Sequence, residues 1–229
     1  MLKKFARIVV KGLLWFLVLS VIWVLAYKFV PVPYTSLMAI RSAQGGPDTQ
    51  HDWIALDKVA PSMQLAVICA EDQHFLNHNG FDYNAIKAAY ERNRKGNTLR
   101  GGSTISQQTA KNVFLWPGRS YVRKGFEAYF TFLIELLWSK ERILEVYLNS
   151  IEMGEGVYGV EAAAQHWFNK PAKDLTRHEA AAIAAILPNP REYKANPRTP
   201  YLETRKQWVL RQMYNFGSLD FKTHETAKN

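Results

Sequence analysis

Residues 70–80 of the chain are Ala70-Glu71-Asp72-Gln73-His74-Phe75-Leu76-Asn77-His78-Asn79-Gly80, and they follow an apolar stretch with helical spacing. In that stretch apolar side chains recur at steps of three and four residues, as on the buried face of a helix: Met63, Ala66, Val67 and Ala70. Glu71, four residues after Val67, continues this row. Asn79-Gly80 is then expected to break the regular structure of the segment. The pattern predicts a helix that starts near Pro61 and whose buried face ends in a carboxylate.

Two interpretations of Glu71 are open at this point. A carboxylate at the end of a buried face is costly unless its pKa rises or a partner stabilises it, and a raised pKa suits a general base near neutral pH. In the alternative, the helix ends at Ala70, and Glu71 and Asp72 are solvated charges. These residues alone favour neither interpretation.

The composition indicates a folded, basic protein. With 229 residues, 48% of them apolar, the chain is long enough for one good-sized domain or two small ones. The 29 Lys and Arg against 20 Asp and Glu give a net charge of +9, which suits an anionic partner such as nucleic acid, anionic lipid or a phosphorylated substrate. No DNA-binding motif is present, so we expect no nucleic-acid partner. The single cysteine, Cys69, is expected to be a buried apolar residue.

The N-terminal segment predicts a membrane anchor. The chain from Gly12 to Tyr27 has no charged residue, and a helix from Ile8 to Val30 would be about 34 Å long, enough to span a bilayer. Four basic residues precede the uncharged stretch and favour a cytoplasmic N-terminus: Lys3, Lys4, Arg7 and Lys11. The alternative is a signal peptide cleaved near Val24-Leu25-Ala26. Because the segment is long and rich in bulky residues, we expect a retained anchor.

The remaining chain is expected to be one mostly α-helical unit, since helical periodicity recurs along it and strand signals are nearly absent. Gly154, Gly156 and Gly159 indicate a glycine-rich turn. We divide the chain into a cytoplasmic N-terminus with its anchor (1–31), a juxtamembrane connector (32–52), a folded domain (53–217) and a tail (218–229).

A second informative stretch surrounds Gly101-Gly102-Ser103-Thr104. Thr104 and Gln107 have the spacing of a capping box at the start of a helix. On that helix Thr104, Gln108 and Lys111 would share one face, and a glycine-rich loop before a helix can bind phosphate through its free N–H groups. An ordinary polar helix face behind a Gly-Gly turn is the alternative, and the spacing alone favours it.

A basic row follows, with Arg119, Arg123 and Glu127 at intervals of four and Lys124 beside them. It can be a phosphate-binding cluster, or a helical Arg–Glu pair worth about 0.2–0.5 kcal/mol. His74 and His78 have the spacing of metal ligands, but no third ligand is evident and we predict no metal site formed by the protein.

Four motifs, taken in order, resemble the signature of the peptidoglycan glycosyltransferases, glycosyltransferase family 51. They are Glu71-Asp72-x2-Phe75-x2-His78-x-Gly80, Gly101-x-Ser103-Thr104-x2-Gln107-Gln108-x2-Lys111-Asn112, Arg123-Lys124-x2-Glu127 and Ile143-Leu144-x2-Tyr147-Leu148-Asn149. The chain is similar to the monofunctional biosynthetic transglycosylases of this family, which are related to the glycosyltransferase domain of class A penicillin-binding proteins. Each motif alone is weak, but four in order are specific.

The resemblance implies a lysozyme-like, mostly α-helical domain with a small membrane-proximal lobe. It implies polymerisation of lipid II into β-1,4-linked glycan with inversion and release of undecaprenyl diphosphate, and no transpeptidase activity. Glu71 matches the general base and Glu127 the second essential acid. Residues matching the substrate and pyrophosphate site are Lys111, Arg119, Arg123, Lys124, Thr104, Gln108 and Asn112. Residues expected to shape the site are Asp72, Phe75, His78, Gly101 and Ser103.

The resemblance also sets expectations about surroundings. It implies no firm cofactor and leaves open a divalent cation at the substrate pyrophosphate. The expected partners are lipid II, the growing glycan chain, inner-membrane lipid and proteins of cell-wall synthesis or division. The expected location is the bacterial inner membrane, with one pass and a periplasmic catalytic domain. Two alternatives stay open: a lytic transglycosylase, which has little use for the basic row, and an anchored scaffold without catalysis.

Overall fold

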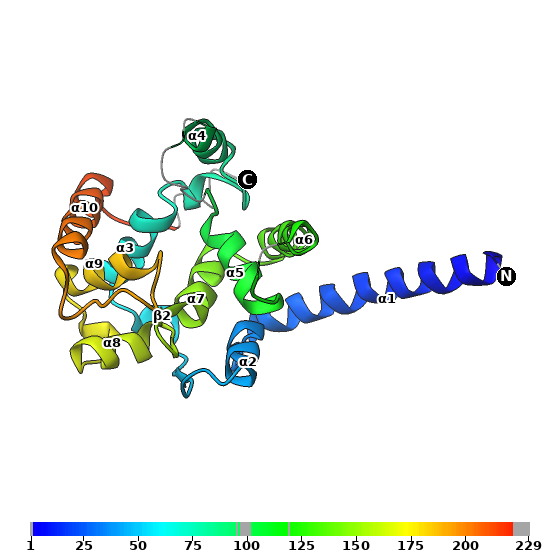
Figure 1. Ribbon diagram of the computed structural model, residues 1–229, viewed down its shortest axis with the longest axis horizontal. Coiled ribbons are helices and arrows are strands. Elements are labelled where there is room, and N and C mark those ends of the chain that lie inside the picture. The colour runs from blue at the N-terminus through cyan, green and yellow to red at the C-terminus, as the bar shows by residue number, and fades with distance from the viewer. Residues whose placement is uncertain (1, 95, 97–101, 119, 222–229) are drawn as a thin grey trace.

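The computed structural model describes residues 2–94, 96, 102–118 and 120–221. One long helix, α1 (Leu2–Phe29), projects from a helical body (Figure 1). The other α-helices of the described ranges are α2 (Ser36–Ala43), α3 (Pro61–Glu71), α4 (Tyr83–Arg94), α5 (Ile105–Phe114), α6 (Tyr121–Leu137), α7 (Lys140–Ser150), α8 (Val160–Phe168), α9 (Arg177–Ile186) and α10 (Pro200–Phe216). Short 3₁₀ turns are η1 (Leu56–Lys58), η2 (Phe75–Asn77) and η3 (Ala172–Asp174). The mostly α-helical prediction is confirmed.

The glycine-rich turn that the sequence indicated is present at Glu155 and Gly156, and it joins two strands of a small sheet that was not predicted. Its strands are β1 (Gln50–His51), β2 (Glu152–Gly154) and β3 (Val157–Tyr158), in the order β1-β3-β2. β3 pairs antiparallel with β2 and parallel with β1. Strands of two or three residues are too short to show an alternating pattern, which is why sequence analysis missed them.

The core of the body is built around α3, which packs against α9 and α10, while α5 packs against α6 and α7. Residues 180–186 of α9 are buried on all sides, because their mostly alanine side chains allow close helix packing. The predicted capping box of Thr104 and Gln107 is present on α5, and a second capping box, of Thr176 and Glu179, is found on α9. They fix where these helices begin.

Helix α1 is the one helix of the described residues that is long and apolar enough to cross a membrane, with a mean hydropathy of 2.5 over its most apolar window. Its C-terminal part packs on α6, where the hydroxyls of Ser20 and Tyr129 lie 2.6 Å apart. The indole N–H of Trp138 donates to the carbonyl of Val24 at 2.9 Å. The guanidinium of Arg142 donates to the carbonyl of Tyr27 at 2.7 Å. The anchor helix is therefore attached directly to the body.

The segment 32–52, which we expected to be a connector, contains helix α2. Thr35 caps this helix and Met38 is fully buried. The hydroxyl of Ser36 donates to the carbonyl of Val113 on α5 at 2.9 Å, so α2 packs beside the helix that carries Gln108 and Lys111.

Candidate active site

Glu71 is the last residue of α3, and its side chain is partly buried rather than free in solvent. The amide of Gln108 on α5 donates to its carboxylate at 2.8 Å. Burial raises the pKa of Glu71, and the nearby Asp72 acts in the same direction. The hydrogen bond from Gln108 and the charges of Arg205 and Lys111 oppose that rise. Of the two interpretations of Glu71, the helix that continues to a desolvated carboxylate is the one observed.

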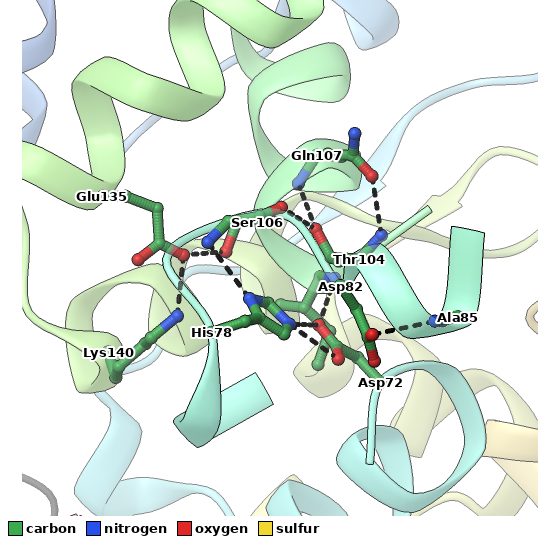
Figure 2. A network of polar contacts seen from close by, with 11 residues as sticks. Asp72, His78, Asp82, Ala85, Thr104, Ser106, Gln107, Glu135 and Lys140 are labelled. Atoms are coloured by element: carbon green, nitrogen blue, oxygen red, sulfur yellow. Dashed lines mark hydrogen bonds and ion pairs between the residues drawn. The ribbon is translucent and has the colours of Figure 1, made fainter. Parts of the chain in front are cut away.

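Asp72 and His78 connect the end of α3 to the start of α5 (Figure 2). The carboxylate of Asp72 accepts hydrogen bonds from His78 Nε2 at 2.9 Å and from the backbone N–H of Ile105 at 3.0 Å. The Gly80 N–H donates to His78 Nδ1 at 3.1 Å, so a neutral His78 carries its proton on Nε2. The hydroxyl of Thr104 donates to the Gly80 carbonyl at 2.7 Å. These bonds fix α5 relative to Glu71 and set the position of Gln108.

Gly80 is required where this segment passes α6. Its φ is +87°, in the left-handed region, and an added Cβ would lie 2.7 Å from Thr131 Cγ2 and 3.0 Å from Glu135 Cγ. Only glycine meets both conditions without displacing α6.

A buried polar group lies beneath the segment (Figure 2). The Ser106 hydroxyl donates to the carboxylate of Glu135, which also pairs with Lys140 at 2.7 Å. The ammonium of Lys140 lies 4.6 Å from the centre of the Phe75 ring. Sequence analysis did not single out Glu135 or Lys140. The available signal was an acid between the apolar residues Ile134 and Leu137 of the α6 face.

Glu127 on α6 is the centre of a buried charge cluster. It is 3% exposed, its carboxylate accepts from Arg123 Nη1 at 2.7 Å, and Lys124 pairs with its other oxygen. The small energy of an exposed helical pair does not apply to this buried arrangement. Lys111 lies near the same cluster. Burial lowers its pKa, Arg123 and Lys124 lower it further, and Glu127 and Glu71 raise it.

A cavity of about 450 Å³ lies between α2, α5, β2 and the loop after α9. Its lining includes four of the predicted site residues, namely Gln108, Lys111, Asn112 and Arg123. Lys111 and Arg123 supply positive charge, and Gln108 connects the cavity to the carboxylate of Glu71. The arrangement can bind an anionic group beside a carboxylate that is able to accept a proton.

Comparison with known proteins places the chain in one family. The sequence profile of the family described as "Transglycosylase" matches residues 38–214. A biosynthetic peptidoglycan transglycosylase of Pseudomonas syringae pv. syringae is 51% identical over 226 residues, covering 96% of each chain. The protein of the same name from Mannheimia succiniciproducens is 51% identical over 89% of this chain and 86% of its own. The one from Bacteroides thetaiotaomicron is 50% identical over 93% and 88%.

The chain belongs to the family of biosynthetic peptidoglycan transglycosylases. The resemblance seen in the four motifs is thereby confirmed, as is the lysozyme-like fold class. The transglycosylase is an enzyme of the glycosyltransferase type, which excludes the alternative of an anchored scaffold protein without catalytic activity.

The other predicted site residues of the transglycosylase differ in how far they are buried and in which groups they contact. Phe75 is fully buried in the core, the side chain of Thr104 is occupied by its cap and by Gly80, and Ser103 is exposed. Gly101 and Arg119 lie outside the described residues. Within the described residues, no group of three or more His, Cys, Asp or Glu side chains is placed to hold a metal ion.

Two residues near the site were missed by sequence analysis. Arg205 of α10 acts electrostatically on Glu71 while its Nε donates to the Ala185 carbonyl at 3.0 Å. Arg41 of α2 lines the cavity. Neither belongs to one of the four motifs, and only the folded arrangement reveals their location.

Proposed function

We propose that this transglycosylase polymerises lipid II into β-1,4-linked glycan and releases undecaprenyl diphosphate. Glu71 acts as the general base and removes the proton from the acceptor 4-hydroxyl. The observation that carries this assignment is the desolvated Glu71 carboxylate, bonded to Gln108 and lying beside a cationic cavity. A carboxyl whose pKa is raised towards the working pH is a better base than an ordinary exposed glutamate.

The basic residues stabilise the leaving group. Negative charge develops on the donor diphosphate as the glycosidic bond to it breaks, and fixed cations stabilise that charge most effectively in a site with little water. Lys111, Arg123 and Lys124 are the described candidates. Both oxygens of Glu127 are occupied by Arg123 and Lys124, so Glu127 holds these cations in place for the donor. A divalent cation at the diphosphate would add to the same neutralisation.

The proposed reaction inverts the donor anomeric carbon. The acceptor oxygen, activated by Glu71, attacks from the face opposite the diphosphate, which leaves towards the cations. One base and one departing anion are sufficient, and no covalent enzyme intermediate is required. A lytic enzyme needs a single acid and no site for a diphosphate, so the buried cluster around Glu127 favours synthesis over cleavage.

The proposed topology puts the body on the periplasmic side of the inner membrane. Helix α1 fits a single membrane span, and the basic residues Lys3, Lys4 and Arg7 precede its uncharged stretch. The lipid-linked substrate and the growing glycan would then meet the cavity next to the bilayer. A reporter enzyme fused after Asn229 and active in the cytoplasm would contradict this orientation.

The test is an assay of the purified full chain on lipid II, with glycan products separated by size. Glu71→Gln should lower polymerisation by about 10²- to 10⁴-fold or more, because it removes the base and keeps the side chain's size. Glu127→Gln should also impair turnover while keeping the acidic limb of the pH profile. Glu141→Gln, an exposed glutamate on α7, is the matched control and should behave as wild type.

The outcomes separate the competing functions. Polymerisation by Glu71→Gln within a few-fold of wild type would refute its role as base. Cleavage of preformed glycan without polymerisation would identify a lytic enzyme. Loss of activity in EDTA that is restored by Mg²⁺ would show that a divalent cation takes part at the diphosphate.

A further inference from the structure

Helix α2, outside the four motifs, supplies two residues to the cavity, Leu37 and the charged Arg41. Arg41, in the last turn of this helix, lines the cavity together with Lys111 and Arg123, which come from α5 and α6. Three cationic side chains from three separate helices therefore meet around one space of about 450 Å³. That volume lies in the range of sites for small ligands.

Arg41 has an unused hydrogen-bond donor. Its Nε is buried, and no acceptor for it exists among the described residues. The Nε of Arg123, on the same cavity, is buried and lacks a described acceptor in the same way. Buried N–H groups are rarely left without a partner, and each exception calls for an explanation. Two such donors on one cavity are explained by a ligand rich in oxygen acceptors.

Arg41 forms no ion pair with a described acid, although its charge acts at longer range on Glu152 and opposes the rise that burial causes in the pKa of that carboxyl. In the part of the chain that the structure describes, no carboxylate oxygen lies within 4.0 Å of its guanidinium nitrogens. Glu152 is the acid that shares the cavity with it, and this residue is 8% exposed. The Glu152 carboxylate accepts a long hydrogen bond from the Gly156 N–H at 3.4 Å. Arg123, by contrast, pairs with Glu127 at 2.7 Å.

We propose that Arg41 is a substrate-positioning residue of this transglycosylase, and that its guanidinium binds an anionic oxygen of the donor substrate in the cavity. The proposal rests on the proposed function, since that function supplies the donor. A guanidinium fork matches both phosphate and carboxylate oxygens. Two parts of the donor offer such oxygens: its diphosphate, and the carboxyl groups of the peptide on its sugar.

The kinetic test compares Arg41→Ala, Arg41→Lys and wild type on lipid II. Loss of a hydrogen bond to a charged group should raise KM by about 10- to 100-fold, while kcat changes much less. Arg41→Lys keeps the charge without the fork and should recover part of the loss. The matched control is Arg191→Ala, because Arg191 is a partly exposed arginine that pairs with Glu155 and does not line the cavity. Its KM should stay at the wild-type value.

Thermal unfolding separates positioning from a structural role. The melting temperature of Arg41→Ala should stay close to that of wild type while KM rises. A fall in melting temperature with wild-type KM in the folded fraction would overturn the proposal. An unchanged KM in Arg41→Ala would overturn it as well.

Direct binding identifies the source of the anion and does not depend on turnover. The probes are a short-chain prenyl diphosphate without sugar, lipid II with its pentapeptide, and lipid II without it. Weaker binding of the sugar-free diphosphate to Arg41→Ala assigns the contact to the diphosphate. A defect seen only with the pentapeptide present assigns it to the peptide carboxylates. Equal binding of all three probes to Arg41→Ala and wild type refutes the proposal, even if the enzyme polymerises lipid II.

Discussion

At the scale of single residues, the pKa of Glu71 is set by opposing influences. Burial and Asp72 raise it, while the Gln108 hydrogen bond, Arg205 and Lys111 lower it. As the proposed general base, Glu71 must lose its proton before it can act, so activity should fall as the pH drops through its pKa. Because the net shift is upward, the acidic limb of the pH profile should lie above the ordinary value of 4.5.

Gln108→Leu tests this balance. The substitution removes a hydrogen bond that stabilises the charged form of Glu71, so the pKa of Glu71 should rise further. The acidic limb of kcat/KM should move to higher pH, with activity recovering in more alkaline buffer. Gln73→Leu is the control, since Gln73 contacts the Cys69 carbonyl and Gln212 rather than Glu71. An acidic limb that stays in place in Gln108→Leu would show that another group sets it.

The sequence could predict part of this site. The row that ends in Glu71 and the shared face of Thr104, Gln108 and Lys111 follow from helical spacing within one segment. The enclosure of Glu71 does not, because it depends on Gln108, 37 positions along the chain, and on Arg205 of the last helix. The burial of Glu71 results from packing between segments that are far apart in the sequence, so the local periodicity cannot predict it.

At the scale of elements, hydrogen bonds of the segment around Gly80 hold α5 against the end of α3, and Gly80 itself packs closely against α6. Gly80→Ala should destabilise the protein by about 2–4 kcal/mol, since it adds left-handed strain and a contact of 2.7 Å with Thr131. Gly45→Ala is the matched control, because Gly45 has a φ of +75° and an added Cβ would have no neighbouring heavy atom within 4 Å. It should cost about 1 kcal/mol.

Thermal or chemical unfolding of both variants measures the difference. The gap between them reports the close approach to α6 alone, since the backbone strain is shared. Equal destabilisation of the two variants would mean that α6 accommodates the added methyl group at position 80 with no further loss of stability. The local sequence contained a signal for a break at Asn79-Gly80, but the neighbour that makes glycine necessary lies on α6.

Element prediction worked where a pattern was long and failed where it was short. The capping box of α5 and the apolar row of α3 that leads to Glu71 were recognisable, because caps and apolar rows are local features. Helix α2 has eight residues and the strands two or three, so their patterns are too brief to separate from a loop. Arg41 was missed for the same reason, because it belongs to α2.

At the scale of the whole molecule, Arg142 joins the anchor to the body. Its guanidinium donates two hydrogen bonds to the carbonyl of Tyr27 in the last turn of α1, where backbone acceptors lack partners within the helix. Arg142→Ala should therefore loosen the junction and increase tryptic cleavage after Lys28 several-fold in the detergent-solubilised protein. Mass spectrometry of the fragments measures the rate.

The control for this experiment is Arg198→Ala, which removes a partly exposed arginine paired with Glu203. It should leave cleavage at Lys28 unchanged. Equal cleavage rates in Arg142→Ala and wild type would show that packing of α1 on α6 is sufficient to hold the junction. The sequence predicted the apolar span, but its attachment joins residues more than a hundred positions apart.

The attachment of α1 also has a consequence for how the enzyme meets its substrate. Because the last turns of α1 are bonded to Trp138 and Arg142, the body cannot swing freely on a tether. With the proposed topology and the proposed lipid-linked substrate, the cavity would be held at a constant height and tilt above the bilayer. Enzyme and substrate would then meet by diffusion in two dimensions. In that arrangement the encounter rate would depend on the number of substrate molecules per unit area of membrane, and not on the volume of the surrounding compartment.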